Sequence, residues 1–302
     1  MKRVIIVGAS GYGNVGDDSY AFLYRTELSH YDVLIYNSDL PEELPPHDLL
    51  VIGGGGLLHT QPGHFEKMTW YLNNARQKGI PTGFSSVGFQ YDPKTLGVDW
   101  KLQAAECWKP FLEQAKFVTV RSPNDLQRAA ELGIRAQYFP DLCYLMRRHI
   151  PKNLPCNHKV LVIVPGAGVF RYDPNAQSLM GLQESCTQRY VRGWLDAGGR
   201  LEVVRMGAPN DTVIHLKRLR HLYKGVPVYD EGNPKECLRR IAGAGQVISG
   251  RYHGMIFARC AGVPCYTVPL APYKIVSEPP ADTPDNMMRG AAHHLEVLRN
   301  YL

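Results

Sequence analysis

The stretch Q-V-I-S-G-R-Y-H-G-M-I-F-A-R-C-A-G-V-P-C, residues 246–265, contains the signals of a strand, a glycine turn and a helix in that order. The strand is predicted over Val247–Ser249 and the helix from His253, and Gly262 stops that helix before Pro264 leads into another strand. A strand that turns directly into a helix is the basic unit of α/β folds with parallel sheets.

Arg251 and His253 stand at this strand-to-helix junction. The unpaired backbone N–H groups and the dipole of a helix N-terminus favour an anion. A guanidinium matches the oxygens of a phosphate or carboxylate, and an imidazole transfers protons near neutral pH. The pair therefore indicates an anion site with a proton donor. The simpler interpretation is that Arg251 caps a neighbouring carbonyl and His253 is an ordinary residue of the first helical turn.

Strand and helix signals alternate along the whole chain, which predicts parallel sheets with helices on both faces. In the first half the predicted strands are Arg3–Gly8, Val33–Tyr36, Leu49–Ile52, Thr82–Phe84, Phe117–Val120 and Gln137–Phe139, and the predicted helices are Asp18–Leu28, Phe65–Lys78, Lys101–Gln114 and Pro123–Leu132. In the second half they are strands Lys159–Val164, Leu201–Arg205, Val226–Tyr229, Gln246–Ser249 and Cys265–Val268, and helices Asn175–Ala197, Asp211–Leu222, Pro234–Ala242 and His253–Ala261.

Arg147–His158 has two prolines and little periodicity, and we interpret it as a linker. The chain is therefore predicted to form two Rossmann-like α/β domains, residues 1–150 and 151–302, which face each other across a cleft. A last helix is predicted over Asp285–Leu302.

A glycine-rich segment, G-Y-G-N-V-G over Gly11–Gly16, satisfies the dinucleotide-binding pattern after the first strand. Two carboxylates, Asp17 and Asp18, follow in the first helical turn, where they would repel a pyrophosphate. We therefore favour a different role, in which Asn14 and one of these aspartates face the cleft and the carboxylate orients or deprotonates a hydroxyl. Simple N-capping by the aspartates is the alternative, and the sequence leaves open which of them has a function.

A second glycine run, Gly53–Gly56, is predicted to end an apolar strand at the carboxyl edge of the sheet. Its bare backbone lets a ligand or a neighbouring segment approach closely, which makes Gly54 and Gly55 candidate binding residues. His59 follows on a loop and is either a binding residue or a polar loop residue.

The composition is that of a globular protein, with 302 residues, 44% hydrophobic and 21% charged residues and a net charge of +6. No nucleic-acid-binding motif and no metal-ligand motif stands on a suitable element, so we expect no nucleic acid partner and no bound metal. Seven cysteines without a C-x-x-C spacing indicate free thiols in a reducing compartment. Because no signal peptide precedes the first strand and no apolar run is long enough to cross a bilayer, we expect a cytoplasmic protein.

Three blocks of the sequence together resemble the polysaccharide pyruvyl transferase family. Residues 13–18 are similar to its G-N-x-G-D block, residues 53–57 to its G-G-G-x-L block, and residues 250–258 contain its R-x-H. Val120–Ser122, Leu132–Ile134 and Pro140–Asp141 resemble its middle section, and Tyr273 and Lys274 resemble the residues that follow the R-x-H. The resemblance spans residues 4–275 in the order of the family.

The resemblance implies a GT-B type fold, in which the C-terminal helix crosses back to the first domain. It also implies transfer of an enolpyruvyl-derived group from phosphoenolpyruvate to hydroxyls of a sugar in a polysaccharide or its precursor, with release of phosphate. The acceptor is then a sugar, an oligosaccharide or a lipid-linked glycan. With a lipid-linked acceptor, we expect the protein to make weak peripheral contact with the inner face of the membrane. The reaction needs no metal and no redox cofactor.

By matching positions, the resemblance makes His253 the general acid and Arg251 an anion clamp, with Arg121 and Lys274 as further cations. Tyr252 stands where the family usually has leucine and shapes the pocket. A strand-end salt bridge to Asp141 or Asp125 is the alternative for Arg121, and surface exposure is the alternative for Lys274.

Two other function classes remain open on the sequence. A GT-B glycosyltransferase that uses a nucleotide sugar is the main alternative, although no acidic residue is placed to bind a ribose near the R-x-H. A sugar-binding or scaffold protein without activity is the third.

Overall fold

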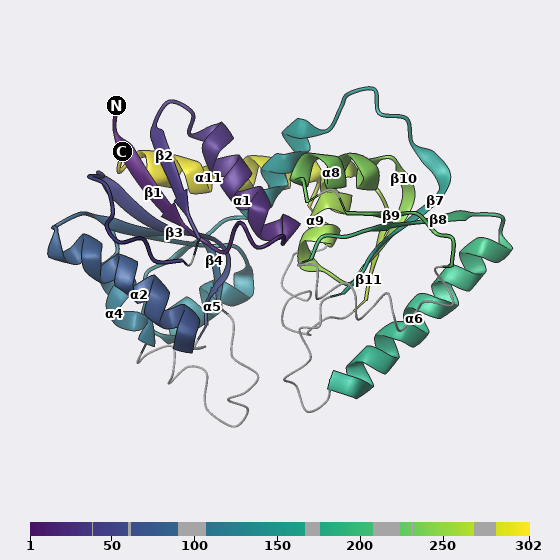
Figure 1. Cartoon of the computed structure of the whole chain (residues 1–302), viewed down its shortest axis with the longest axis horizontal. Helices are drawn as coiled ribbons and strands as arrows, with labels where there is room; N and C mark the ends of the chain where they lie inside the picture. The colour runs from purple at the N-terminus through teal and green to yellow at the C-terminus, as the bar shows by residue number, and fades with distance from the viewer. Residues whose placement is uncertain are drawn as a thin grey trace. The chain divides into compact units, whose positions relative to one another are not determined.

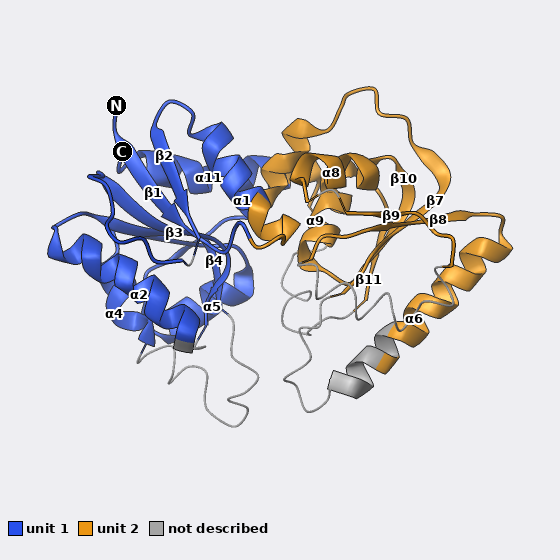
Figure 2. Cartoon of the chain, viewed as in Figure 1, with its two compact units in different colours: residues 1–11, 19–142, 287–302 blue, residues 12–18, 143–286 orange. Residues whose placement is uncertain are grey.

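The computed structural model describes residues 1–37, 39–59, 62–89, 107–166, 176–207, 224–230, 232–268 and 282–302. The chain divides into two compact units, each with its own parallel sheet (Figure 2). Unit 1 comprises residues 1–11, 19–142 and 287–302, and unit 2 comprises residues 12–18 and 143–286. Two α/β units with parallel sheets are the architecture predicted from the alternating pattern.

The sheet of unit 1 has the order β2-β1-β3-β4-β5-β6, and its described strands run parallel. The strands are β1 Arg3–Val7, β2 Asp32–Tyr36, β3 Leu49–Leu58, β4 Thr82–Phe89, β5 Phe117–Val120 and β6 Gln137–Tyr138. The helices are α1 Val15–Glu27, α2 Pro62–Gln77, α4 Lys109–Gln114, α5 Pro123–Glu131 and α11 Pro284–Arg299. One core cluster joins the strands to α2, α4 and α5, while α1 and α11 lie on the other face of the sheet (Figure 1).

Helix α5 begins and ends where its sequence signals predict. Ser122 is the N-cap, its side chain accepts from the backbone N–H of Asp125, and Pro123 opens the helix. Gly133 follows the helix with a φ of +74°, a backbone conformation that costs glycine little. Burial raises the pKa of the Asp125 carboxyl, and this effect is partly offset by Arg121 and by hydrogen bonds from Ser122 and Phe89.

The C-terminal helix α11 packs in unit 1 through a small residue and a buried histidine. Gly290 lies against the ring of Pro140, where a β-carbon would meet Cδ at 2.8 Å. His294 is fully buried, with Nδ1 2.7 Å from Thr119 Oγ1 and Nε2 3.0 Å from the carbonyl oxygen of Pro140. This pairing fits a neutral ring that donates to Pro140 and accepts from Thr119.

The sheet of unit 2 has the order β11-β10-β7-β8-β9, again with parallel pairs. Its strands are β7 Asn157–Val164, β8 Arg200–Val204, β9 Val228–Tyr229, β10 Ala244–Ser249 and β11 Cys265–Thr267. Its helices are α6 Ala176–Asp196, α8 Pro234–Ala242 and α9 Tyr252–Ala261, with the 3-10 helix η2 Leu142–His149 at the start of the unit. Val191 on α6 joins the core on one face of this sheet, and α9 packs on the other through Gly254 against Val164.

Three sequence predictions of local structure were wrong. The strand predicted over Thr82–Phe84 continues as β4 to Phe89. The strand predicted to end at Ile52 continues as β3 through the glycine run to Leu58, because Gly53 and Gly55 pair with Ser85 and Val87 of β4. The proposed linker Arg147–His158 is partly regular, since η2 extends to His149 and β7 begins at Asn157. The predicted helix at 211–222 and residues 101–106 of another lie outside the described residues. None of the described helices has an apolar stretch long enough to span a membrane.

Gly54 is required where it stands because Tyr20 of α1 packs on it. Its φ is +77°, and a β-carbon there would meet Tyr20 Cβ at 2.5 Å, with the ring carbons closer still. We expect Gly54→Ala to lower the free energy of unfolding by about 2–4 kcal/mol through left-handed strain and steric overlap. Urea unfolding measures this effect. Gly63→Ala in the first turn of α2, where a β-carbon meets open space, is the matched control and should be neutral or stabilising. Equal stability of the two variants would contradict the packing argument.

His294 makes stability depend on pH. Burial lowers the pKa of His294 to about 4, and the nearby Asp141 carboxylate offsets part of that effect. Because the unfolded chain binds this proton more readily, the stabilisation is complete above about pH 6.5 and is lost as the pH falls toward 4. We expect wild type to lose up to about 3 kcal/mol more than His294→Gln between pH 7 and pH 4. Urea titrations of both proteins across this range test it, and parallel pH profiles would contradict it.

Candidate active site

The junction of β10 and α9 is held by hydrogen bonds of one serine. The backbone N–H of Arg251 donates to Ser249 Oγ at 3.1 Å, and the Ser249 hydroxyl donates to the carbonyl oxygen of Arg251 at 2.8 Å. Arg251 is the N-cap residue, with extended backbone (φ −129°, ψ 141°), and its side chain makes no cap hydrogen bond.

The guanidinium of Arg251 is half-buried beside the ends of two neighbouring strands. Its Nε donates to the carbonyl oxygen of Pro165, just after β7, at 3.1 Å. This bond to a neighbouring carbonyl is of the kind that the simpler interpretation expects. The group also lies against Gly207, just after β8, where a β-carbon would meet Nε at 2.8 Å.

His253 occupies the first turn of α9 and is half-buried. The ring of Tyr252, itself buried, meets the imidazole nearly edge to face, with centroids 5.3 Å apart and an interplanar angle of 77°. The opposite neighbour is Gly16, on which a β-carbon would meet the imidazole Cγ at 2.5 Å. Thus the N-terminal glycine motif and the R-x-H meet within unit 2.

Segment 12–18 is itself ordered by Asn14. Asn14 Oδ1 accepts from the backbone N–H of Gly16 at 3.2 Å, and Asn14 Nδ2 donates to Asp17 Oδ2 at 2.5 Å. Its carbonyl oxygen also accepts from the N–H of Asp18 at 2.9 Å. The side chain that caps the start of α1 is thus Asn14, and the Asp17 carboxylate holds the Asn14 amide in place.

Arg121 lies in unit 1 and has a buried partner. Its Nη1 is 3.5 Å from Asp141 Oδ2 and 3.3 Å from the hydroxyl of Tyr20, which donates to the same carboxylate at 2.6 Å. Asp141 is fully buried and Arg121 is 8% exposed, so the guanidinium has a buried counter-charge inside unit 1. This geometry favours the salt-bridge interpretation of Arg121.

The remaining candidates of unit 1 have neighbours from their own unit. Gly54 and Gly55 are buried, and the segment that approaches Gly54 is α1. His59 stacks on His64 with ring centroids 4.0 Å apart, and its backbone carbonyl accepts from Trp108 Nε1 at 3.0 Å. Burial lowers the pKa of His64 to about 4, so that ring is neutral at physiological pH. Lys274 lies outside the described residues.

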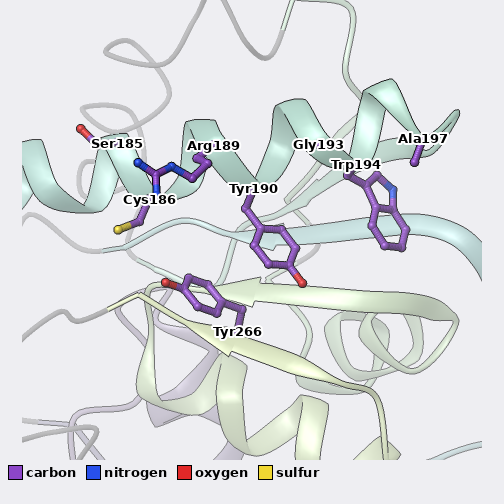
Figure 3. A pocket seen from close by; sticks show the side chains of 8 residues that line it. All are labelled: Ser185, Cys186, Arg189, Tyr190, Gly193, Trp194, Ala197 and Tyr266. Carbon is purple, nitrogen blue, oxygen red and sulfur yellow. The ribbon is translucent and has the colours of Figure 1, made fainter.

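A separate cavity of about 630 Å³ lies between α6 and β11 in unit 2 (Figure 3). The rings of Tyr190 and Tyr266 stack there, with centroids 5.2 Å apart and an interplanar angle of 19°. The indole N–H of Trp194 is 3.2 Å from the carbonyl oxygens of Lys159 and Arg200, so its polar atom is already satisfied. The cavity lies on the α6 face of the sheet, opposite α9, and its described lining contains none of the predicted site residues.

The structure thus gathers Asn14, Asp17, Asp18, Arg251, Tyr252 and His253 in unit 2, and Gly54, Gly55, His59 and Arg121 in unit 1. Sequence reasoning missed Gly207, which lies against Arg251. Its signal was its position three residues after the end of β8, at the carboxyl edge where ligands of open α/β sheets bind.

Solved structures similar to this chain have the GT-B fold. One is the UDP-GlcNAc 2-epimerase of Methanocaldococcus jannaschii in complex with UDP-GlcNAc and UDP, with 11% identity, a TM-score of 0.52 and coverage of 98% of this chain and 93% of that one. The enzyme of the same name from Neisseria meningitidis has 9% identity, a TM-score of 0.52 and coverage of 100% and 93%. An alpha-glucosyltransferase in complex with UDP and DNA has 13% identity, a TM-score of 0.52 and coverage of 88% and 79%. At these identities the similarity establishes the fold, two Rossmann-like units of GT-B type.

A search of the curated proteins found no match to the chain. The family model of polysaccharide pyruvyl transferase matches residues 3–270, which include both glycine blocks and the R-x-H. The resemblance noted in the sequence is thereby confirmed over most of the chain. The protein is therefore a transferase that belongs to the polysaccharide pyruvyl transferase family.

Proposed function

We propose that the protein transfers the enolpyruvyl-derived group of phosphoenolpyruvate to two hydroxyls of a sugar and releases phosphate. The observation that carries this proposal is the pairing of Arg251 and His253, both half-buried, where β10 ends and α9 begins. The first turn of α9 contains no acidic residue, so its N-terminus can attract an anion. Phosphoenolpyruvate has three negative charges and must be protonated on carbon. It therefore needs both an anion site and a proton donor.

The reaction balances without any oxidant or reductant. His253 in its protonated form donates to the methylene carbon of phosphoenolpyruvate, and the adjacent carbon becomes cationic. A sugar hydroxyl attacks that carbon and loses its proton to a base. The carbon–oxygen bond to phosphate then breaks, and a second hydroxyl of the same sugar closes the ketal and loses its proton to the released phosphate. Arg251 holds the carboxylate or phosphate of the donor and stabilises the charge that develops on the leaving group.

The other predicted residues have narrower roles in this proposal. Asp18, in the first turn of α1, is the proposed base for the hydroxyl, and Asp17 is proposed to hold the Asn14 amide in the turn. Tyr252 supports the imidazole from one side. Lys274 is proposed as a second cation for phosphate, whereas Arg121, paired with Asp141, contributes mainly to the packing of unit 1. Gly55 and His59 are proposed to border the acceptor, which is a sugar, an oligosaccharide or a lipid-linked glycan at the cytoplasmic face of the membrane, whereas Gly54 makes room for Tyr20 of its own unit.

Ligand binding separates this proposal from a glycosyltransferase. We expect phosphoenolpyruvate to raise the melting temperature of the protein, since a ligand that binds only the folded chain stabilises it. Uridine diphosphate and its sugars should leave the melting temperature unchanged. Stabilisation by a uridine nucleotide alone would instead favour a nucleotide-sugar enzyme, and stabilisation by neither would favour a protein without activity. Phosphate release measured over a panel of sugar acceptors then identifies the substrate.

Substitution at the two central residues should give different kinetic effects. His253→Ala should fold normally and lose at least about 100-fold in kcat, because proton transfer to carbon is removed. Arg251→Lys should mainly raise the KM for phosphoenolpyruvate by about 10-fold, because the forked contact is lost. The exposed His30→Ala and Arg135→Lys are matched controls that should behave as wild type. Turnover of His253→Ala within a few-fold of wild type would exclude this residue as the acid.

The two aspartates should also differ. Asp18→Asn should lower kcat by about 100-fold, because a neutral amide cannot accept the hydroxyl proton. Asp17→Ala should instead lower the free energy of unfolding by about 1 kcal/mol, because Asn14 loses its acceptor. Steady-state kinetics and urea unfolding of both variants measure the difference. A large kcat loss in Asp17→Asn with normal turnover in Asp18→Asn would reverse the assignment.

A further inference from the structure

The N-terminal motif and the end of β8 are joined in unit 2 although they are far apart in the sequence. The backbone N–H of Val15 donates to the carbonyl oxygen of Met206 at 3.1 Å. Met206 is 1% exposed and Val15 is also 1% exposed, so this bond is shielded from water. It fixes the position of segment 12–18 relative to the carboxyl edge of the second sheet.

Gly16, the next residue, forms one wall for the imidazole of His253. A β-carbon on Gly16 would lie 2.5 Å from Cγ and 2.9 Å from Cε1 of the ring, with Nδ1 closer still. Gly16 is buried, and its carbonyl oxygen accepts a weak hydrogen bond from Cys143 Sγ at 3.8 Å. Cys143 is in turn contacted by Cys260 of α9, whose Sγ donates to its carbonyl oxygen at 3.8 Å. Because Gly16 is packed on both sides, an added methyl group can be accommodated only by moving the ring.

Gly207, which follows Met206, forms the corresponding surface for Arg251. A β-carbon on Gly207 would lie 2.8 Å from Nε, with Cζ and Nη2 closer still. The same guanidinium donates from Nε to the carbonyl oxygen of Pro165, so a hydrogen bond and the contact with Gly207 both bear on its position. Neither glycine has a positive φ, so the bare Cα is explained by the neighbouring side chain rather than by the backbone conformation.

We propose that Gly16 and Gly207 are positioning residues, which hold the imidazole of His253 and the guanidinium of Arg251 at the place of reaction. The turn Met206–Gly207 couples the two, since one of its residues bonds the segment that carries Gly16 and the other contacts Arg251. The assignment of turnover to these groups rests on the proposed function, whereas the contacts themselves do not.

The two glycines have different expected effects because the side chains that contact them differ in stiffness. An imidazole has two rotatable bonds and is contacted near its base, so Gly16→Ala should displace the whole ring. A misplacement of about 1 Å costs up to about 100-fold in rate, and we expect that loss in kcat. The guanidinium is at the end of a flexible chain, so Gly207→Ala should mainly raise the KM for phosphoenolpyruvate, by about 10-fold. Gly181→Ala on α6, where a β-carbon meets nothing within 4 Å, is the control and should behave as wild type.

A double-variant cycle tests the contact with His253 without any assay of turnover. If Gly16→Ala forces the ring aside, it should lower the melting temperature in wild type but much less in a His253→Ala background, where the ring is absent. An equal loss in both backgrounds would overturn the proposal, and so would wild-type kcat in Gly16→Ala. This cycle also resolves the case in which Gly16→Ala folds poorly, since His253→Ala should then restore folding.

Nuclear magnetic resonance of the histidine ring keeps this inference separate from the proposed function. The Cε1–H signal of His253, assigned by its loss in His253→Gln, should shift in Gly16→Ala and stay unchanged in Gly181→Ala. If wild type fails to use phosphoenolpyruvate but the signal shifts as expected, the reaction is wrong and the positioning is right. An unchanged signal in Gly16→Ala overturns the positioning, whatever the substrate.

Discussion

The close packing of an imidazole on a bare glycine is the constraint on which the site in unit 2 depends. His253 is in the first turn of α9, and only a residue without a side chain leaves space for its ring beside segment 12–18. That segment must therefore leave the first sheet after β1 and join the second unit before α1 continues in unit 1. The Asn14 turn and the Val15–Met206 hydrogen bond hold segment 12–18 in a defined position in unit 2.

Much of the fold could be predicted because its signals are local. The Ser122 cap and the glycine after α5 fix that helix from a dozen residues, and the apolar runs mark the strands. The path of β3 through Gly53–Gly56 could not be predicted, because glycines end strands unless a neighbouring strand pairs with them, and that neighbour is β4. The assignment of segment 12–18 to unit 2 likewise depends on a bond to Met206 across most of the chain, for which the sequence gives no signal.

The candidate site shows the same division between local and distant information. The junction that presents Arg251 and His253 was recognisable from a strand, a glycine and a helix start, all within 20 residues. Arg121 was equally conspicuous at the end of a strand, but its charge is balanced by Asp141, which is fully buried. Removal of one member of such a buried pair leaves the other charge uncompensated, so a loss of activity in Arg121 variants would reflect folding as well as binding. Gly207 has no side chain that the sequence would mark as functional, and its contact with Arg251 is visible only in the structure.

The two helix N-termini of the site differ in charge, and this difference determines where an anion can bind. The first turn of α1 contains Asp17 and Asp18, so its positive end is already neutralised, and a pyrophosphate would be repelled there. The first turn of α9 contains no acid, and its cap residue is an arginine. The carboxylates at the start of α1 and the cation at the start of α9 belong to the same unit. In the proposed reaction, the sugar hydroxyl that needs a base would therefore approach the start of α1, and the anionic donor would approach the start of α9. In the proposed reaction, the segment whose glycine pattern resembles a dinucleotide motif therefore supplies the base, and the anion binds beside Arg251.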